Sequence, residues 1–286
     1  MADSHGSAVE IQNLDWAVRD VTDAEVAFYR ANGWVKLPKL IAPELAQEIL
    51  RHAKELVGEN AERAARTADP QHPSPYDHLA PVLRNYLGPN RKDPYLRRLA
   101  QSPSMGRVAS RLCRGEPIRF LDDEFLVKPP ASEGSRPTPW HQDFPHTFFD
   151  RSALTNIWIA LVGLPPERGP MRFLSGSHRA GPLGRTLQDP ELDLVAEHPD
   201  LLDEFEISPP LHLESGDATV HTDLTAHSGP PNLSDAPRWA YLVNLFRADA
   251  RYTGAVTHSE AIEGVPVDGR FETARYPLVW PPEARG

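Results

Sequence analysis

A histidine followed two residues later by an aspartate occurs three times in this sequence, and each such pair could bind a metal ion. The triplets are His141-Gln142-Asp143, His198-Pro199-Asp200 and His221-Thr222-Asp223. Side chains alternate between the two faces of an extended strand, so the outer residues of a triplet would point to the same side. With a second histidine from a distant strand they would form a facial triad, which binds Fe(II) and leaves open positions for oxygen chemistry.

The surroundings of the triplets favour the first one as the metal pair. Pro199 inside the second triplet disfavours a central strand, because proline removes a hydrogen bond from the sheet. Only two histidines follow the third triplet, and neither lies the roughly 45 residues away that five short strands with their turns would need. We therefore expect His141 and Asp143 to bind the metal, with His221 and His227 as competing candidates for the second histidine.

Composition narrows the class of partner. The 286 residues carry a formal net charge of -10, and no basic run flanks the first triplet. This balance disfavours nucleic acid or an anionic membrane surface as a main partner and leaves a small-molecule substrate. The sequence leaves the oligomeric state open.

The cellular compartment is inferred from the single cysteine and from the first residues. Cys113 has no second cysteine to pair with, which fits a reducing cytoplasm. Residues 1–13 are polar and acidic, and no apolar run approaches the length that spans a membrane. We expect a soluble, cytoplasmic protein.

No charge block or long Gly/Ser linker divides the chain, so we expect one domain over residues 1–286. Its helical N-terminal part should cover about residues 22–113, a jelly-roll core about 117–249, and a tail 250–286. Within the helical part, Thr22 and Glu25 form a capping box and Gly33 a stop signal, and Pro43 opens a second helix. Residues 60–94 and 130–139 are polar and proline-rich and are expected to close over the site as loops.

Short β-rich segments separated by Gly and Pro turns follow residue 117. The expected strands are 118–127, the segment that contains His141, and 155–162, 171–174, 218–221 and 239–246, with an irregular insertion at 181–210. Segment 155–162 is too apolar for an edge strand. The pattern predicts a mainly β protein with flanking helices, built as a double-stranded β-helix of the jelly-roll, cupin-like kind.

From Thr22 to about Phe246 the chain resembles the phytanoyl-CoA dioxygenase family of Fe(II)- and 2-oxoglutarate-dependent oxygenases. The residues that carry the resemblance are Lys128-Pro129-Pro130, Trp140-His141-Gln142-Asp143, Asn156-Ile157-Trp158-Ile159-Ala160-Leu161, Gly169-Pro170, Ser175-Gly176-Ser177-His178-Arg179, Gly216-Asp217, His227, Asn232, Ser234 and Arg238. The resemblance implies Fe(II), 2-oxoglutarate and O2 as cofactors. It further implies His141, Asp143 and His227 as iron ligands, and Arg238 as the partner of the distal carboxylate of 2-oxoglutarate.

The spacing of Arg238 is compatible with that role. Eleven residues lead from His227 to Arg238, enough to end one strand, turn at Gly229-Pro230-Pro231 and begin its neighbour. The planar guanidinium holds a carboxylate at two points. The alternative role for Arg238 is a surface ion pair, which fits poorly with its position at the start of an apolar strand.

Further cofactor contacts follow from the resemblance. Lys128 and Gln142 match family positions near the cofactor, and Trp158 could contact it or pack in the core. Many family members have Ser or Thr two residues after the distal histidine, where this chain has Gly229, and Ser228 stands one residue earlier. Ser228 is therefore a weaker candidate for the hydroxyl that supports the cofactor carboxylate in those family members.

Residues close to the metal segment are candidates for the substrate pocket. His146, Phe148 and Phe149 follow the first triplet closely and could line the pocket or simply pack together. His221 would be a pocket or core histidine if His227 is the ligand.

The resemblance implies that 2-oxoglutarate is decarboxylated to succinate and CO2 while hydrogen is removed from an unactivated carbon. Asp143 stands where related halogenases have a small residue, which favours oxygenation. The acidic chain offers no basic groove for a CoA thioester, so we expect a small metabolite such as a terpenoid or polyketide. Hydroxylation is the default, with epimerisation, cyclisation or desaturation as alternatives. Two alternatives come from other functional classes: a non-oxidative zinc enzyme, and a jelly-roll binding protein without turnover.

Overall fold

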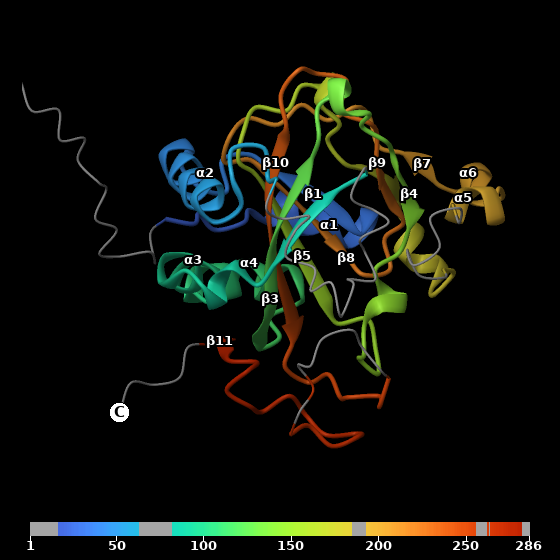
Figure 1. Ribbon diagram of the computed structural model, residues 1–286. Coiled ribbons are helices and arrows are strands. Elements are labelled where there is room, and N and C mark those ends of the chain that lie inside the picture. Colours follow the sequence, from blue (N-terminus) through green and yellow to red (C-terminus); the bar gives the residue numbers. More distant parts are fainter. Residues whose placement is uncertain (1–16, 63–81, 185–192, 256–261, 263, 282–286) are drawn as a thin grey trace, which may run out of the picture.

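Two antiparallel β-sheets that face each other form the centre of the protein (Figure 1). The structure is a computed structural model and describes residues 17–62, 82–184, 193–255, 262 and 264–281. In these residues the larger sheet has seven strands in the order β1-β8-β5-β10-β3-β11, with β2 paired to β3, and the smaller sheet has four in the order β4-β9-β6-β7. This architecture confirms the predicted mainly β fold with flanking helices.

The strands of the larger sheet are β1 (Trp34–Leu37), β2 (Arg84–Leu87), β3 (Ile118–Lys128), β5 (Leu154–Ala160), β8 (Ala218–Thr222), β10 (Arg238–Arg247) and β11 (Leu278–Trp280). Those of the smaller sheet are β4 (Thr138–His141), β6 (Arg172–Ser175), β7 (Glu206–Ile207) and β9 (His227–Gly229). Strand β5 lies between β8 and β10, and all its residues are buried, as the apolar run predicts. Strand β10 lies inside the sheet, between β5 and β3.

Local sequence signals determine where the N-terminal helices begin and end. The helices are α1 (Asp23–Asn32), α2 (Pro43–Val57), α3 (Pro94–Ala100) and α4 (Pro103–Leu112). The predicted capping box at the start of α1 is present, and Gly33 ends the helix in a left-handed conformation with φ 77°. Asp93 and Ser102 cap α3 and α4 through their side chains.

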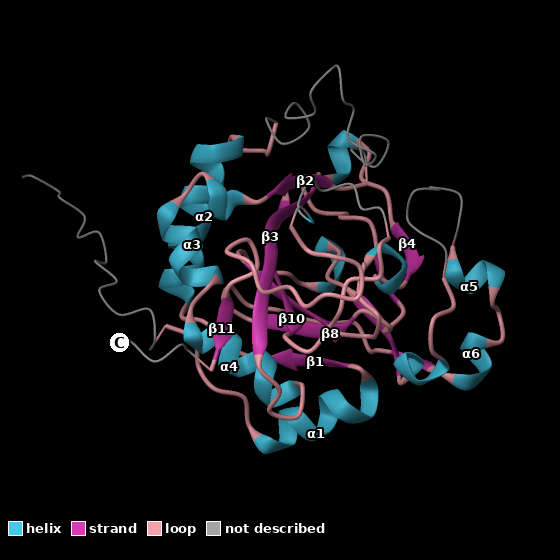
Figure 2. Cartoon of the chain, turned by 90° about the horizontal axis from the view of Figure 1, so that it is seen from below, coloured by secondary structure: helices cyan, strands magenta, loops and turns pink. Residues whose placement is uncertain are grey.

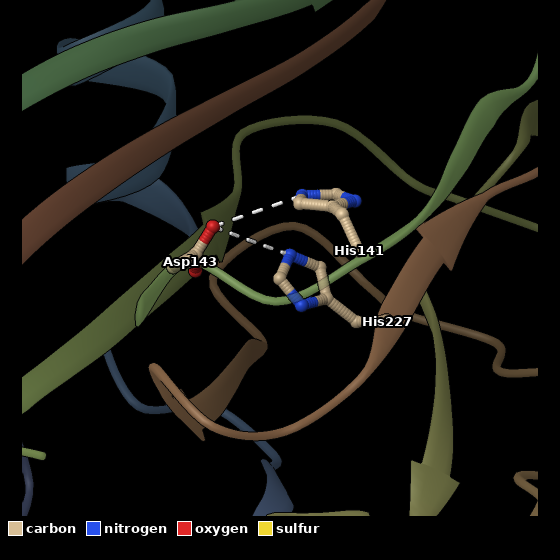
Figure 3. A group of neighbouring side chains, drawn as sticks. All are labelled: His141, Asp143 and His227. Carbon is tan, nitrogen blue, oxygen red and sulfur yellow. Dashed lines mark ion pairs between the residues drawn. The ribbon is translucent and has the colours of Figure 1, made fainter. Parts of the chain in front are cut away.

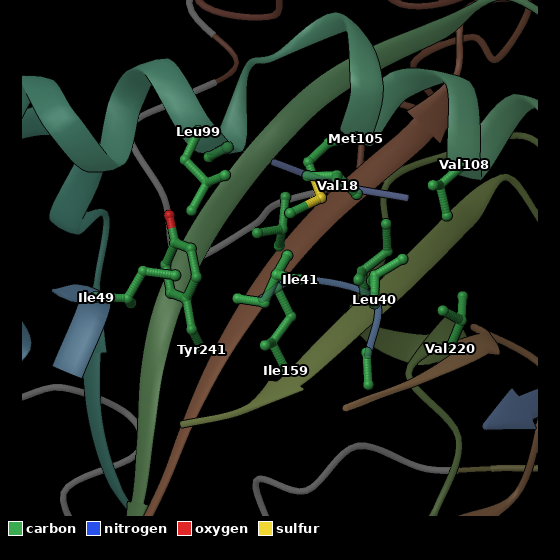
Figure 4. Packing of buried hydrophobic residues seen from close by; sticks show 14 of the residues in the cluster. Val18, Leu40, Ile41, Ile49, Leu99, Met105, Val108, Ile159, Val220 and Tyr241 are labelled. Atoms are coloured by element: carbon green, nitrogen blue, oxygen red, sulfur yellow. The ribbon is translucent and has the colours of Figure 1, made fainter. Parts of the chain in front are cut away.

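The helices cover the outer face of the larger sheet (Figures 1 and 2). Alternate residues of β10, such as Trp239, Tyr241 and Val243, face this helical layer and join its apolar cluster. Figure 4 shows Leu99, Met105 and Val108 of α3 and α4 over the sheet strands. Burial of this face, at about 25 cal/mol per Å² of apolar surface, holds the larger sheet rigidly in place.

The intervening residues of β10 face the interior between the two sheets. Ala240 and Leu242 belong to a second apolar cluster, in which Trp34 of β1 stacks on Phe173 of β6 with ring centroids 4.7 Å apart. Because side chains alternate, Arg238 points to the same interior as Ala240 and Leu242. The interior face of β10 is therefore where we look for functional side chains.

Several elements depart from the expected division of the chain. Strands β1 and β2 precede the expected jelly-roll core and β11 follows it, yet all three pair into the larger sheet. The expected loop 60–94 contains β2 and the 3-10 helix η4 (Pro89–Arg91), and residues 63–81 lie outside the described residues. The expected irregular insertion 181–210 contains α5 (Leu194–Glu197), α6 (Leu201–Glu204) and β7, with 185–192 outside the described residues.

The other short elements are the 3-10 helices η5 (Ala131–Glu133), η6 (Phe144–His146), η7 (Pro166–Arg168) and η8 (Ser177–Ala180). No helix among the described residues is both long and apolar enough to cross a membrane.

Candidate metal centre

His141 and His227 lie opposite each other at the ends of the paired strands β4 and β9. Their side chains and that of Asp143 point toward one another in Figure 3. One ligand atom from each of the three lies within 4.8 Å of the other two, and no other group of this kind occurs among the described residues. The structure thus brings His141, Asp143 and His227 together.

Asp143 reaches this group by a bend and not by strand alternation. Strand β4 ends at His141, and Asp143 has helical backbone angles of φ -80° and ψ -19° just before η6. The expectation that both residues share one face of a strand is therefore wrong. The bend is fixed in part by the Phe144 amide, which donates to the carbonyl oxygen of Asp223 at 2.9 Å.

Backbone carbonyls set the tautomers of the two histidines. Nδ1 of His141 lies 2.8 Å from the Pro139 oxygen, and Nδ1 of His227 lies 2.9 Å from the Thr225 oxygen. Each Nδ1 therefore donates, which leaves the Nε2 lone pair for a metal. Burial lowers the pKa of both histidines, so both are neutral and able to bind a metal.

The carboxylate of Asp143 is oriented by two neighbours. Its Oδ2 accepts hydrogen bonds from Asn156 Nδ2 and from His221 Nε2, the latter at 3.2 Å. Its Oδ1 lies 3.7 Å from His141 Nε2 and 3.8 Å from His227 Nε2. Burial alone would raise the pKa of Asp143, but the electrostatic interaction with the imidazoles of His227, His221 and His141 and the hydrogen bond from His221 outweigh it and lower the pKa. Asp143 is therefore a carboxylate with one free oxygen.

These distances fit a first-row metal ion. Metal–ligand bonds of about 2.0–2.2 Å place two ligands of the same ion roughly 3 to 4 Å apart. The separations between Asp143 Oδ1 and the two Nε2 atoms fall in that range. Two neutral imidazoles and one carboxylate on one side are the donor set of a facial Fe(II) site.

His221 lies beside the group, and its ring is 4.3 Å from that of His227. Its Nε2 is committed to Asp143, while its buried Nδ1 has no hydrogen-bond partner among the described residues. The structure therefore places His221 as a support for the carboxylate, and His227 in the ligand group.

Arg238 is the first residue of β10 and its side chain points to the interior, with 3% of its surface exposed. It donates from one terminal nitrogen to the Gly169 oxygen at 2.8 Å, and its guanidinium lies 5.2 Å from the ring centre of Trp158. Its buried Nε has no partner, and no carboxylate pairs with it among the described residues. Burial lowers the pKa of Arg238 to about 10.

Lys128 lies directly opposite Arg238 on strand β3 and is fully buried. Its Nζ lies 2.9 Å from the Arg136 oxygen and 3.1 Å from both the Thr138 hydroxyl and the Gly229 oxygen. Burial, and then the charge of Arg238, lower the pKa of Lys128 to about 6.

Gly229 leaves room between the two basic side chains. A Cβ atom at this position would lie 3.4 Å from the Thr138 hydroxyl, 3.6 Å from Arg238 and 3.7 Å from Lys128 Nζ. Gly229 is two residues from His227 on the same strand, so both face the interior. Two buried cations without an acidic partner, on the face that carries the metal ligand, fit the distal carboxylate of a dicarboxylate.

The remaining predicted cofactor residues have other contacts. The side-chain amide of Gln142 is hydrogen-bonded to the backbone. It donates to the carbonyls of Gly181 and Leu224 and accepts from the Leu183 amide. Ser228 alternates with His227 and Gly229, so it faces away from the interior, and its buried hydroxyl has no partner among the described residues. Trp158 faces the interior and packs beneath Arg238.

Phe148 and Phe149 pack in an aromatic cluster at one end of the sheets, together with Phe246, Phe271 and Tyr276. Only 6% and 4% of their surfaces are exposed, so packing in this cluster is sufficient to explain why both residues are aromatic. His146 lies in η6, directly after Asp143. A role of these three residues in substrate binding stays a prediction.

Sequence reasoning did not assign roles to Asn156 and Thr138. Asn156 supports Asp143, and Thr138 contacts Lys128 beside Gly229. Asn156 carried a usable signal, because a polar residue inside the otherwise apolar run 154–160 is costly to bury without a specific partner.

A facial triad with open positions is typical of non-haem Fe(II) oxygenases, and the buried cation pair adds a place for a dicarboxylate cosubstrate. Comparison with protein families leads to the same class. The family described as Phytanoyl-CoA dioxygenase (PhyH) matches residues 29–240, and this chain belongs to that family.

Individual relatives agree. A methylphosphonate hydroxylase from Gimesia maris is 25% identical over 224 residues, which cover 76% of this chain and 78% of the relative. The non-haem, alpha-ketoglutarate-dependent carbocyclase SnoK from nogalamycin biosynthesis has a similar structure, with a TM-score of 0.72 at 25% identity over 90% of this chain and 96% of SnoK. The epimerase SnoN, in complex with Fe3+, alpha-ketoglutarate and nogalamycin RO, gives 0.70 at 25% identity over 90% and 97%.

The protein is therefore a 2-oxoglutarate-dependent non-haem oxygenase that uses iron and 2-oxoglutarate. Its likeness to these oxygenases also confirms the predicted cupin-like jelly roll. The alternatives of a non-oxidative zinc enzyme and of a binding protein without turnover are excluded by this family membership.

Proposed function

We propose that this oxygenase hydroxylates an unactivated C–H bond of a small organic metabolite during the tailoring of a natural product of the terpenoid or polyketide kind. The observation that carries the proposal is the pairing of a complete triad, His141, Asp143 and His227, with the buried Arg238–Lys128 pair. The activities of the relatives support it, since they include a hydroxylase and two enzymes of nogalamycin biosynthesis.

In this proposal His141, Asp143 and His227 hold the iron. The two imidazoles are kept neutral by burial and fixed in one tautomer by carbonyl oxygens, so no proton has to leave before the metal binds. Asn156 and His221 hold one oxygen of Asp143 and leave the other for the ion. With iron and 2-oxoglutarate bound, the site supplies oxidation of a C–H bond coupled to conversion of 2-oxoglutarate and O2 into succinate and CO2.

Arg238 and Lys128 bind the distal carboxylate of 2-oxoglutarate in this proposal, and Trp158 keeps the guanidinium in place from below. Gly229 leaves space for the carboxylate, and Thr138 supplies the hydroxyl that many relatives carry at the position of Gly229. The diacid is thereby oriented with its other end toward the triad.

A second reaction with the same cofactors is favoured by the likeness to SnoK and SnoN. These proteins are described as a carbocyclase and an epimerase, and each covers 90% of this chain. Cyclisation or epimerisation of the metabolite is therefore the alternative to hydroxylation.

Mass analysis of the product separates these reactions. The enzyme, loaded with Fe(II) and 2-oxoglutarate, is incubated with candidate metabolites under O2 while succinate is measured. Hydroxylation adds one oxygen atom to the metabolite, cyclisation removes two hydrogen atoms, and epimerisation leaves the mass unchanged. Succinate formed together with a product of unchanged mass or of two fewer hydrogens would overturn the hydroxylase proposal in favour of the alternative.

A further inference from the structure

A row of polar side chains crosses the interior face of the larger sheet at the level of the metal centre. Asp122 of β3 pairs with Asn244 of β10, Asn244 pairs with Asn156 of β5, and Asn156 pairs with His221 of β8. Residues paired across strands point to the same face, so all four share the interior. Glu124 joins them on β3, because its cross-strand partner Leu242 packs in the interior cluster.

The amide of Asn156 leaves an acceptor free in this row. Its Nδ2 must face Asp143, because a carboxylate accepts hydrogen bonds and an amide oxygen there would repel it. The same Nδ2 lies 3.2 Å from His221 Nε2, on the side of β8. Its Oδ1 is therefore turned toward β10, and it has no partner although only 2% of Asn156 is exposed.

Asn244 repeats this arrangement one strand further on. Its Nδ2 donates to Asp122 Oδ1 at 2.7 Å, which fixes the orientation of the amide. Its Oδ1 is buried and has no partner among the described residues. Two neighbouring amides thus present unsatisfied oxygens to the interior, and an unsatisfied buried acceptor is unfavourable unless a ligand donates to it.

The two carboxylates beside these amides lack a cation. Glu124 receives one hydrogen bond, from Asn85 at 3.2 Å, and forms no ion pair among the described residues. Arg275 and Arg91 are the basic residues whose charges reach Asp122, and neither forms an ion pair with it. Burial raises the pKa of both acids, that of Glu124 to about 8 with further contributions from Asp122 and Asp143.

The interior is therefore polarised along strand β3. Lys128, with Arg238 beside it, is at one end, and Glu124 and Asp122 lie four and six residues earlier on the same face, roughly 13 and 20 Å away at about 3.3 Å per residue. The cation end suits the dicarboxylate cosubstrate. The acidic end, lined by two carboxyl groups and two free amide oxygens, is left for the substrate.

We propose that Asp122, Glu124, Asn244 and the free oxygen of Asn156 form the substrate-recognition site, and that the substrate carries a basic amine. Its ammonium binds between Asp122 and Glu124, and its other N–H or O–H donors meet the two amide oxygens. Strands lie about 4.8 Å apart, so Asp122 is roughly 10 Å along the row from Asn156, which touches the metal ligand Asp143. The oxidised carbon is thus several bonds from the amine.

A cation fits this site better than a neutral polyol does. An ammonium ion between Asp122 and Glu124 favours the ionised form of both carboxyls, because its charge offsets their mutual repulsion and part of the desolvation cost. Hydroxyl groups donate hydrogen bonds but bring no charge that favours ionisation of the two carboxyls. The inference rests on the proposed function, since it names the substrate class of that site.

The test compares amines with neutral molecules of the same shape. Calorimetric titrations are carried out anaerobically on the enzyme loaded with Fe(II) and 2-oxoglutarate, so that no turnover is needed. The probes are cyclohexylamine against cyclohexanol, and D-glucosamine against D-glucose. We expect each amine to bind at least ten-fold more tightly than its neutral partner.

Neutral variants of the two acids make the test specific. Glu124→Gln and Asp122→Asn keep the shape of the side chains, and in the double variant each amine should bind no more tightly than its neutral partner. Glu206→Gln, on the exposed strand β7, is the matched control and should keep the preference. Absence of amine binding, or an undiminished preference in the double variant, would overturn the inference. Formation of the complex with Fe(II) and 2-oxoglutarate in the same samples shows separately whether the proposed function holds.

Discussion

Lys128 and Arg238 stand opposite each other on strands β3 and β10, both buried, and among the described residues neither has an acidic partner. Two like charges held together away from water destabilise the fold unless an anion joins them. In the proposed function this pair, which lies near His227 on the face of Gly229, binds the distal carboxylate of 2-oxoglutarate. The first two predictions follow from this relationship.

Replacing Arg238 should weaken cosubstrate binding selectively. Truncation of one partner of a buried, hydrogen-bonded charge pair costs about 2 to 5 kcal/mol, which corresponds to roughly thirty-fold or more in affinity. Arg238→Ala should therefore raise the KM for 2-oxoglutarate by that factor and change substrate affinity far less. Arg151→Ala, at an exposed ion pair, is the control. An unchanged 2-oxoglutarate titration curve for Arg238→Ala would place the clamp elsewhere.

Binding of 2-oxoglutarate should take up a proton at Lys128. Burial and Arg238 lower the pKa of this lysine from 10.5 to about 6, so at higher pH the free enzyme holds it mostly neutral. A carboxylate favours the charged form and raises the pKa again, so affinity should fall as pH rises above about 6, by up to ten-fold per pH unit.

Calorimetry in buffers of different ionisation enthalpy measures this proton uptake directly. The uptake should vanish in Lys128→Met, which also removes the pH dependence. Binding that releases no buffer protons in the wild-type enzyme across the neutral range would contradict a role for Lys128 at the carboxylate.

His227 and His221 should differ in their effect on iron. His227→Ala removes a proposed ligand and should abolish stoichiometric iron binding and turnover. His221→Ala removes a support of Asp143, and loss of such a support typically weakens metal binding or activity by about 10- to 100-fold. Metal analysis of the purified variants checks both. Full iron in His227→Ala with loss in His221→Ala would reverse the assignment.

In the unliganded protein, Glu124 should lower the free energy of unfolding to an extent that depends on pH. The pKa of this carboxyl rises from 4.5 to about 8 on folding, because of burial and the nearby Asp122 and Asp143. Between these pH values the folded state binds more protons than the unfolded state, so the contribution of Glu124 to stability falls as pH rises through this window.

Glu124→Gln removes that destabilising effect. The melting temperature of the variant relative to wild type should therefore increase steadily from about pH 4.5 to about pH 8. A difference that stays constant over this interval would show that Glu124 titrates normally.

Much of the fold is predictable because its signals are local. The ends of α1 follow from the Thr22–Glu25 capping box and from Gly33, and the buried strand β5 follows from its unbroken apolar run. The short polar strand β2 carries no such signal and forms only because β3 offers it a partner.

The site is predictable only in part, because some of its geometry depends on contacts between residues far apart in the sequence. The residues of the triad follow from a resemblance and from the spacing of the triplets, but the bend that carries Asp143 depends on a contact with Asp223, far away in the sequence. Asp122 and Glu124 lie in the predicted strand 118–127, whose sequence does not show which face they occupy. Their interior placement depends on pairing with β10 and on the register shift next to Asn244, which no local pattern reveals.

An anaerobic titration of the metal-free protein with Fe(II) and 2-oxoglutarate tests the central claim most directly. We expect the weak visible charge-transfer band of the iron–2-oxoglutarate chelate, with one equivalent of each bound. The band should be absent in His227→Ala and should need far more 2-oxoglutarate in Arg238→Ala. A wild-type protein that binds iron but gives no band at any 2-oxoglutarate concentration would contradict the account.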